Sequence, residues 1–200
     1  MENQITSKQD LAIKEIIVEK LFGYFDYRLT NTNTESIENQ LLILYGDNGS
    51  GKTTILKLIF YLLSSKDKSG HKSKIAQTKF KKFSVILNCG IEIGALRTDG
   101  DLGSFNYYIK KKTKILFEVY LKASQDLSIK LDEDAPENVK FKLMLSYLRS
   151  LNLLIFYLSD ERKALDSLTS VELDEDQISS DVEYYIANER EIQRRRKGIR

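Results

Sequence analysis

The stretch "LLILYGDNGSGKTTILKLIFYLL", residues 41–63, constrains the fold of this 200-residue chain more than any other. A continuously apolar segment, residues 41–45, precedes a glycine-rich turn, and a helical pattern begins at about Lys52. Such a short apolar strand, covered on both faces, is typical of the middle of an α/β sheet. The helix that follows has one apolar face with spacings of three and four, formed by Ile55, Leu58, Ile59, Leu62 and Leu63.

The turn between the predicted strand and helix matches G-x-x-x-x-G-K-[ST] at every fixed position. Its glycines permit backbone conformations in which consecutive N–H groups point at an anion, at the N-terminus of a helix. We interpret the turn as a phosphate-binding loop. The residues predicted to hold the nucleotide are Gly46, Asn48, Gly49, Ser50, Gly51, Lys52, Thr53 and Thr54.

Three side chains in this stretch have predicted roles in the chemistry of a bound nucleotide. Lys52 is expected to reach the β- and γ-phosphates and to act in catalysis. Thr53 is expected to bind Mg²⁺ through its hydroxyl, and Thr54 to reach the α-phosphate. The sequence therefore predicts a bound nucleotide together with Mg²⁺.

The rest of the chain alternates between strand and helix patterns. Residues 13–20 and 25–29 read as two strands, and residues 83–121 as a meander of about four antiparallel strands. A helix is expected from Pro136, with acidic residues at its start. The apolar segment "LLIFYL" before Ser159 reads as a further buried strand.

Composition excludes several classes of site. One Cys and one His leave no residues for a disulfide, a zinc cluster or a hydrolase triad. No apolar run is long enough to span a bilayer and no signal peptide is evident. We therefore expect a cytoplasmic protein that does not associate with a membrane. The net charge is +2, with basic runs at 66–82 and 194–200 and an acidic run at 171–183. We expect these runs to be solvated, with DNA contact as the alternative, and His71 to lie at the surface.

"GDNGSGKTT" resembles the phosphate loop of ABC-type ATPases. The preceding "IIVEKLFGYFDYRL" resembles the opening strand pair of the SMC and RecF branch, although the usual Asn and Ser are absent. Bacterial AAA-labelled ATP-binding proteins of this branch look similar. The resemblance implies an α/β P-loop lobe in which the strand pair and the meander pack against a central sheet that carries the phosphate loop.

The same family also uses a signature motif, an acidic Walker B strand and a switch histidine. No Leu-Ser-Gly-Gly-like signature occurs in this chain, and His71 comes too early for the switch. Asp160 and Glu161, after "LLIFYLS", are the candidate catalytic acids, and Asp160 is also a candidate metal ligand. Three interpretations stay open for this segment: a Walker B strand, the strand that ends at the glutamine-loop position, or a surface turn.

We therefore expect an ABC-type N-terminal lobe over residues 1–165 and a helical, charged tail over 166–200. The resemblance implies ATP hydrolysis that drives dimer closure, with DNA or an effector nuclease as partner, in DNA handling or phage defence. The alternatives are a non-hydrolysing regulatory module and a small P-loop kinase. The ending "RRRKGIR" within a helical pattern leads us to expect a fragment that needs a C-terminal lobe or a second copy.

Overall fold

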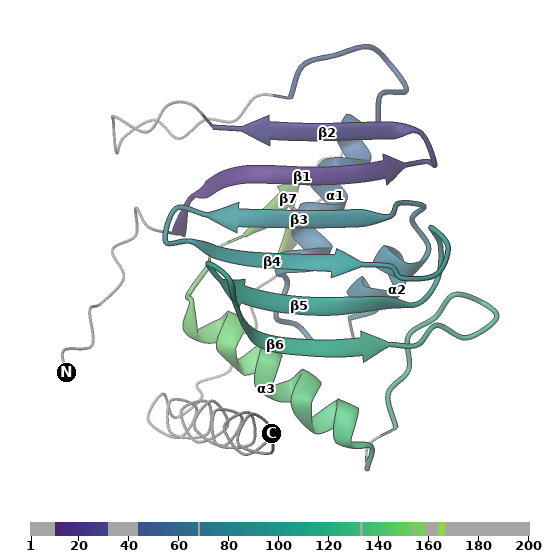
Figure 1. Cartoon of the computed structure of the whole chain (residues 1–200), viewed down its shortest axis with the longest axis vertical. Coiled ribbons are helices and arrows are strands. Elements are labelled where there is room, and N and C mark those ends of the chain that lie inside the picture. Colours follow the sequence, from purple (N-terminus) through teal and green to yellow (C-terminus); the bar gives the residue numbers. More distant parts are fainter. Residues whose placement is uncertain are drawn as a thin grey trace, which may run out of the picture.

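The computed structural model, shown in Figure 1, places a large antiparallel sheet in front of three helices. The structure describes residues 11–31, 44–67, 69–132, 134–153, 155–158 and 164–166.

Six strands form a single antiparallel sheet in the order β2-β1-β3-β4-β5-β6. The two predicted strands and the four-stranded meander are thus confirmed, and they join because β1 pairs with both β2 and β3. The strands are β1 (Ile13–Leu21), β2 (Phe25–Thr30), β3 (Lys82–Leu87), β4 (Ile91–Leu96), β5 (Phe105–Lys111) and β6 (Lys114–Leu121).

The register aligns apolar side chains in a row across the sheet. Because side chains alternate between the two faces of a strand, each strand gives every second residue to the core. Paired positions in β1, β3, β4, β5 and β6 are at most 1% exposed, and this row comprises Ile16, Val85, Ile93, Ile109 and Phe117.

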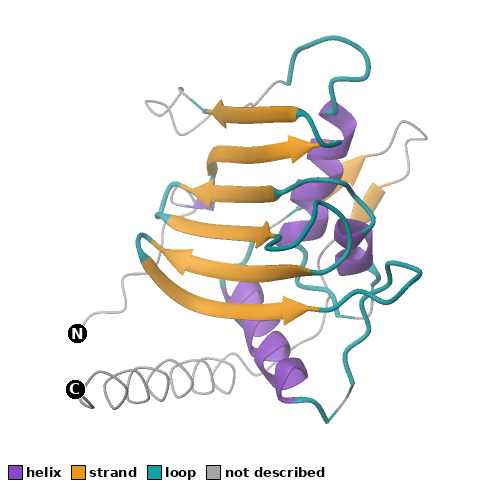
Figure 2. Cartoon of the chain, turned by 45° about the vertical axis from the view of Figure 1, so that its right-hand side comes forward, coloured by secondary structure: helices purple, strands orange, loops and turns teal. Residues whose placement is uncertain are grey.

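Three helices cover this apolar face, and Figure 2 shows them on the same side of the sheet. They are α1 (Lys52–Leu63), α2 (His71–Ala76) and α3 (Pro136–Ser150). The predicted apolar face of α1 is confirmed, since all five of its residues are buried. α3 begins at Pro136, where a missing N–H has no cost, as expected.

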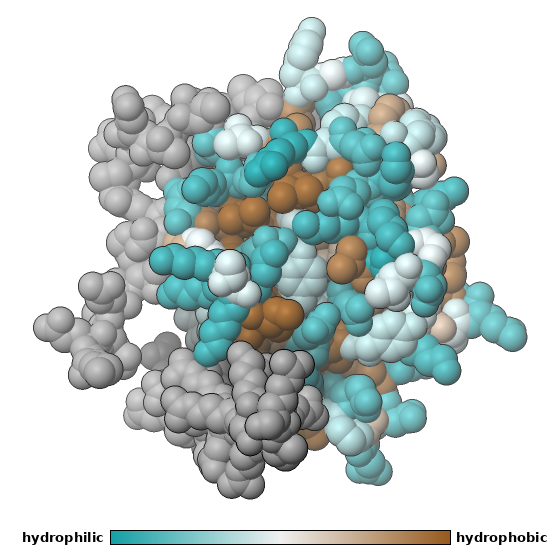
Figure 3. Space-filling model, viewed as in Figure 1, coloured by the Kyte–Doolittle hydropathy of each residue, from teal (hydrophilic) through white to brown (hydrophobic). Residues whose placement is uncertain are grey.

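The opposite face of the sheet is not covered by any helix of the described residues, and Figure 3 shows polar side chains interrupting the apolar ones there. Tyr108 Oη donates to Glu92 Oε1 at 2.7 Å, and Lys110 Nζ lies 2.9 Å from Glu92 Oε2. Burial alone would raise the pKa of Glu92, but the hydrogen bonds from Lys110 and Tyr108 hold it below its ordinary value. This face is therefore stabilised by a charged, hydrogen-bonded network.

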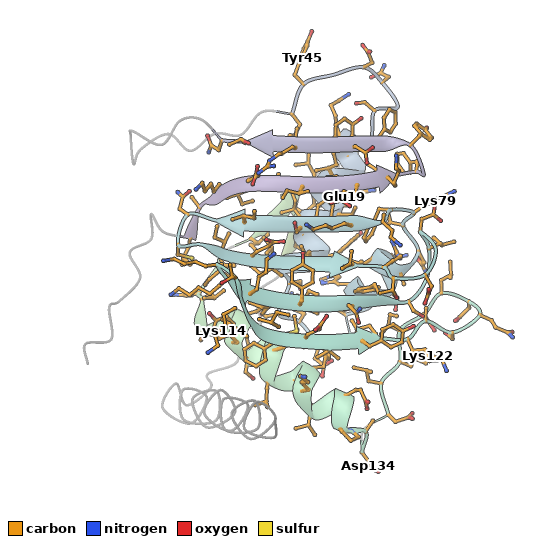
Figure 4. All side chains as sticks on the ribbon, viewed as in Figure 1. Glu19, Tyr45, Lys79, Lys114, Lys122 and Asp134 are labelled. Carbon is orange, nitrogen blue, oxygen red and sulfur yellow. The ribbon has the colours of Figure 1, made fainter. Side chains whose placement is uncertain are left out.

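The predicted strand over residues 41–45 is wrong at its C-terminal end. Leu44 and Tyr45 are irregular, and Tyr45 is 99% exposed and points away from the molecule in Figure 4. The chain already turns here toward the loop, so the phenol ring is left in solvent. Residues 41–43 lie outside the described part. Among the described residues, the strand pair and the meander do not pack on a separate central sheet; they are the main sheet themselves.

The segment "LLIFYL" does contain a strand, β7 (Phe156–Leu158). In the described part of the chain, β7 pairs antiparallel with β8 (Ala164–Asp166) in a two-stranded ribbon and not with the main sheet. The Tyr157 ring lies 6.1 Å from the ring of Phe60 in α1. β7 therefore packs against the helix that follows the phosphate loop.

The expected solvated surface is wrong at two residues of the basic run 66–82, Lys72 and His71. Lys72 is only 7% exposed, because carbonyl oxygens at the end of α1 accept its hydrogen bonds and offset the cost of burying the charge. His71 is half-buried and its ring lies against those of Phe60 and Tyr61. The helix α2 was not predicted from the sequence, and it places both Lys72 and His71 on the helix-covered side of the sheet.

Candidate functional site: the phosphate loop

The glycine-rich loop lies beside β2 at the edge of the sheet and leads directly into α1 (Figure 1). A short turn shapes it, in which Ser50 N–H donates to the Asp47 carbonyl at 3.3 Å. The N–H of Ile55 then donates to the Gly51 carbonyl at 2.8 Å, which is the first bond of the helix. The predicted phosphate-contacting residues therefore lie together, on the loop and on the first turn of α1.

Gly51 is the residue at which the loop becomes a helix, and its position requires glycine for two reasons. Its φ is +86°, in the left-handed region that side chains disfavour. A Cβ atom there would lie 2.7 Å from Leu21 Cδ2 and 3.3 Å from Phe22 Cε2. The backbone of the loop thus packs directly on the end of β1, with no room for a side chain.

The ammonium group of Lys52 is anchored to the start of the loop. Lys52 Nζ donates to the carbonyl oxygens of Gly46 and Asp47, both at 2.7 Å, and lies 3.5 Å from Ser50 Oγ. These contacts hold the positive charge against the loop and not against the apolar core. A cation in this position can attract phosphate oxygens electrostatically.

The first turn of α1 offers backbone donors to an anion. The first N–H groups of any helix have no acceptor inside the helix. Among the described residues, no side chain caps the N-terminus of α1, and its first turn contains no acidic residue. In this first turn Thr53 is exposed and Thr54 is half-buried. The donor set fits a nucleotide phosphate.

Tyr27 is a part of the site that the sequence analysis missed. Its hydroxyl group donates to the Ser50 carbonyl at 2.8 Å, from β2 to the middle of the loop. The ring is stacked on Phe25, with centroids 5.6 Å apart. From the sequence alone, Tyr27 is only one position of the strand predicted over residues 25–29. A phenol in this half-buried strand was the available signal, because a partly buried tyrosine hydroxyl usually finds a hydrogen-bond partner.

The predicted acids, Asp160 and Glu161, lie outside the described residues, so their roles stay predictions. Within the described part of the chain, no three His, Cys, Asp or Glu residues gather as a metal site. Thr53 is therefore the candidate metal ligand whose position is described. Also within that part, neither α1 nor any other helix combines the length and apolarity needed to cross a membrane.

Comparison with protein families agrees with this geometry. A family model described as an AAA domain matches residues 20–199, which include the β1–β2 turn, the whole phosphate loop and α1. No curated protein matches the chain significantly. Because the family match covers most of the sequence, the chain belongs to the AAA domain family, a family of nucleotide-binding, ATPase-type domains.

Proposed function

We propose that this protein binds ATP with Mg²⁺ at the phosphate loop and hydrolyses it by in-line attack of water on the γ-phosphate. The observation that carries the proposal is the arrangement of Lys52 and the loop. The lysine ammonium is held 2.7 Å from two loop carbonyls, directly beside the uncapped N-terminus of α1. A cation and a set of free backbone donors thus converge on one place.

Each part of this arrangement supports a distinct step. The N–H groups at the start of α1 would bind phosphate oxygens, and the loop glycines let the backbone approach them closely. Lys52 would stabilise the negative charge that develops on the transferring phosphoryl group. Thr53 would hold Mg²⁺, which neutralises phosphate charge when bound. Tyr27 would keep the loop in shape by holding the Ser50 carbonyl.

We further infer that the chain belongs to the SMC and RecF branch and that ATP closes two copies, or this lobe and a second lobe, around the nucleotide. The strand pair before the loop and the antiparallel strands after α1 support this assignment. In that branch, as the resemblance implies, the facing subunit completes the site. DNA handling or phage defence is the proposed output.

Calorimetric titration with Mg-ATP tests nucleotide binding. Lys52→Ala removes a charged contact to phosphate, and we expect a loss of affinity of roughly 10- to 100-fold. Lys57→Ala is the matched control, because Lys57 is an exposed lysine on the same helix. We expect its affinity to stay within about twofold of the parent. Equal affinities of the parent and Lys52→Ala would show that the loop does not bind the nucleotide.

Phosphate release at several protein concentrations tests hydrolysis and closure separately. Because no signature motif occurs in this chain, we expect turnover well below about 1 s⁻¹, the low end of typical enzymes. If two copies complete the site, the rate per chain should rise with protein concentration. A rate per chain that does not depend on concentration would contradict closure by a second copy, while leaving ATP binding intact.

A further inference from the structure

A pocket lies at the opposite end of α1 from the phosphate loop. It has a volume of about 330 Å³ and is lined by the α1–α2 connection, α2, residues 129–131 and the first turns of α3. This volume is at the lower end of the range for small-ligand sites. α1 has 12 residues, so its two ends are roughly 18 Å apart at a rise of about 1.5 Å per residue. The pocket is therefore separate from the nucleotide site.

The side chains that line this pocket carry mostly positive charge. Lys66, Lys130 and Lys142 come to it from three different segments, and Asp67 is the one acid among its lining residues in the described part of the chain. Lys130 and Lys142 are exposed, so their ammonium groups can move onto a ligand. A concave surface with this excess of cations attracts an anion.

Lys72 adds a buried amino group to the lining of the pocket. Its ammonium donates to the carbonyls of Tyr61 at 2.9 Å, Leu62 at 3.1 Å and Ser64 at 3.3 Å, and lies 3.1 Å from Tyr107 Oη. These groups occupy all of its donors. Lys72 therefore does not contact a ligand directly, and because burial lowers its pKa to about 7, it is fully charged only below neutral pH.

His71 also lines the pocket, and the charges of Lys72 and Lys66 act on its imidazole ring. Its Nδ1 is 2.7 Å from Ser64 Oγ. Burial first, and then the charges of Lys72 and Lys66, lower the pKa of His71 to about 4. The imidazole is therefore neutral at neutral pH, and an anion placed near these lysines would make it easier to protonate.

We propose that this pocket binds a small molecule that carries a phosphate group. A lysine ammonium group binds phosphate as a point charge, and the described lining residues of the pocket include four lysines, Lys66, Lys72, Lys130 and Lys142. Ile129, Leu131 and Phe141 form an apolar side that can contact the organic part of the ligand. The site is thus built for an organic phosphate whose charged end faces the lysines.

The chain has a single histidine, so NMR of its imidazole reports on this pocket alone. The pKa of His71 is measured in the full chain with increasing phenyl phosphate, with inorganic phosphate, and with sodium chloride at matched ionic strength. We expect phenyl phosphate to raise this pKa saturably, by roughly one pH unit, as a nearby opposite charge does. Inorganic phosphate should act more weakly, because it lacks the apolar part, and chloride should have no saturable effect.

Two variants decide where the signal originates. The double variant Lys130→Ala/Lys142→Ala removes two exposed side chains, and we expect it to fold normally and to lose the saturable change. Lys52→Ala should retain it, because Lys52 belongs to the phosphate loop. The proposal is overturned if phenyl phosphate has no saturable effect, if chloride reproduces it, or if the double variant responds like the parent. Loss of the response in Lys52→Ala would also overturn it, by assigning the signal to the phosphate loop.

Discussion

The contact between Gly51 and β1 allows a sharp test of how the phosphate loop is built. In Gly51→Ala, the new Cβ would lie 2.7 Å from Leu21 Cδ2, which is too close for two carbon atoms. Leu21 is fully buried, so it has little space into which to move. The φ of +86° adds a second cost, because residues with a Cβ disfavour this region.

The size of the destabilisation follows from the steric clash with Leu21 and from the left-handed backbone conformation of Gly51. A non-glycine residue in the left-handed region costs about 1–2 kcal/mol. An added methyl group in a well-packed place costs about 1–3 kcal/mol. We therefore expect Gly51→Ala to lower the free energy of unfolding by roughly 2–5 kcal/mol. It should also weaken ATP binding, because relief of the clash moves the first turn of α1.

Gly49→Ala is the matched control. Its φ of +84° is nearly the same, but a Cβ atom there would meet nothing within 4 Å. Only the cost of the left-handed backbone conformation applies, so we expect the free energy of unfolding to fall by about 1–2 kcal/mol. Urea denaturation of both variants measures the difference. If Gly51→Ala is no more destabilising than Gly49→Ala, the packing of the loop on Leu21 and Phe22 does not contribute as described.

Three further predictions concern single side chains. Tyr27→Phe should lower the free energy of unfolding by about 0.5–1.5 kcal/mol and weaken ATP binding, because it removes the donor to the Ser50 carbonyl. Denaturation measures the first effect and calorimetry the second. If both values are unchanged, Tyr27 does not stabilise the loop. The pKa of His71 is about 4 in the fold and 6.5 as the ordinary value, so the folded state binds fewer protons between these pH values. The free energy of unfolding should therefore fall by ~2–3 kcal/mol as the pH drops from 6.5 toward 4, once solvent screening is allowed for. Denaturation curves of His71→Gln should lack this pH-dependent component. Lys72→Met should lower the free energy of unfolding by roughly 3 kcal/mol or more, because carbonyls at the end of α1 lose their donor. A thermal unfolding midpoint equal to that of the parent would refute this prediction.

Much of the local structure could be predicted from the residues themselves. The glycine pattern, the lysine and the following apolar spacing define a phosphate loop and a helix, because backbone freedom and helical periodicity are properties of short segments. Alternation of apolar residues likewise predicted the strands from β1 to β6. The helix from Pro136 followed from its start signals and periodicity. Each of these predictions depended on residues within about 15 positions of one another.

The tertiary structure decided how these pieces meet. Only the fold places β1 between β2 and β3, so that the strand pair and the meander become one sheet. It also brings Tyr27 to the loop carbonyl of Ser50 and buries Lys72 against the end of α1. The burial of Lys72 contradicted the sequence pattern, since a basic run indicates a solvated surface. The physical reason is that a hydroxyl or an ammonium group can be buried only where acceptors from distant segments surround it, and the sequence does not contain those distances.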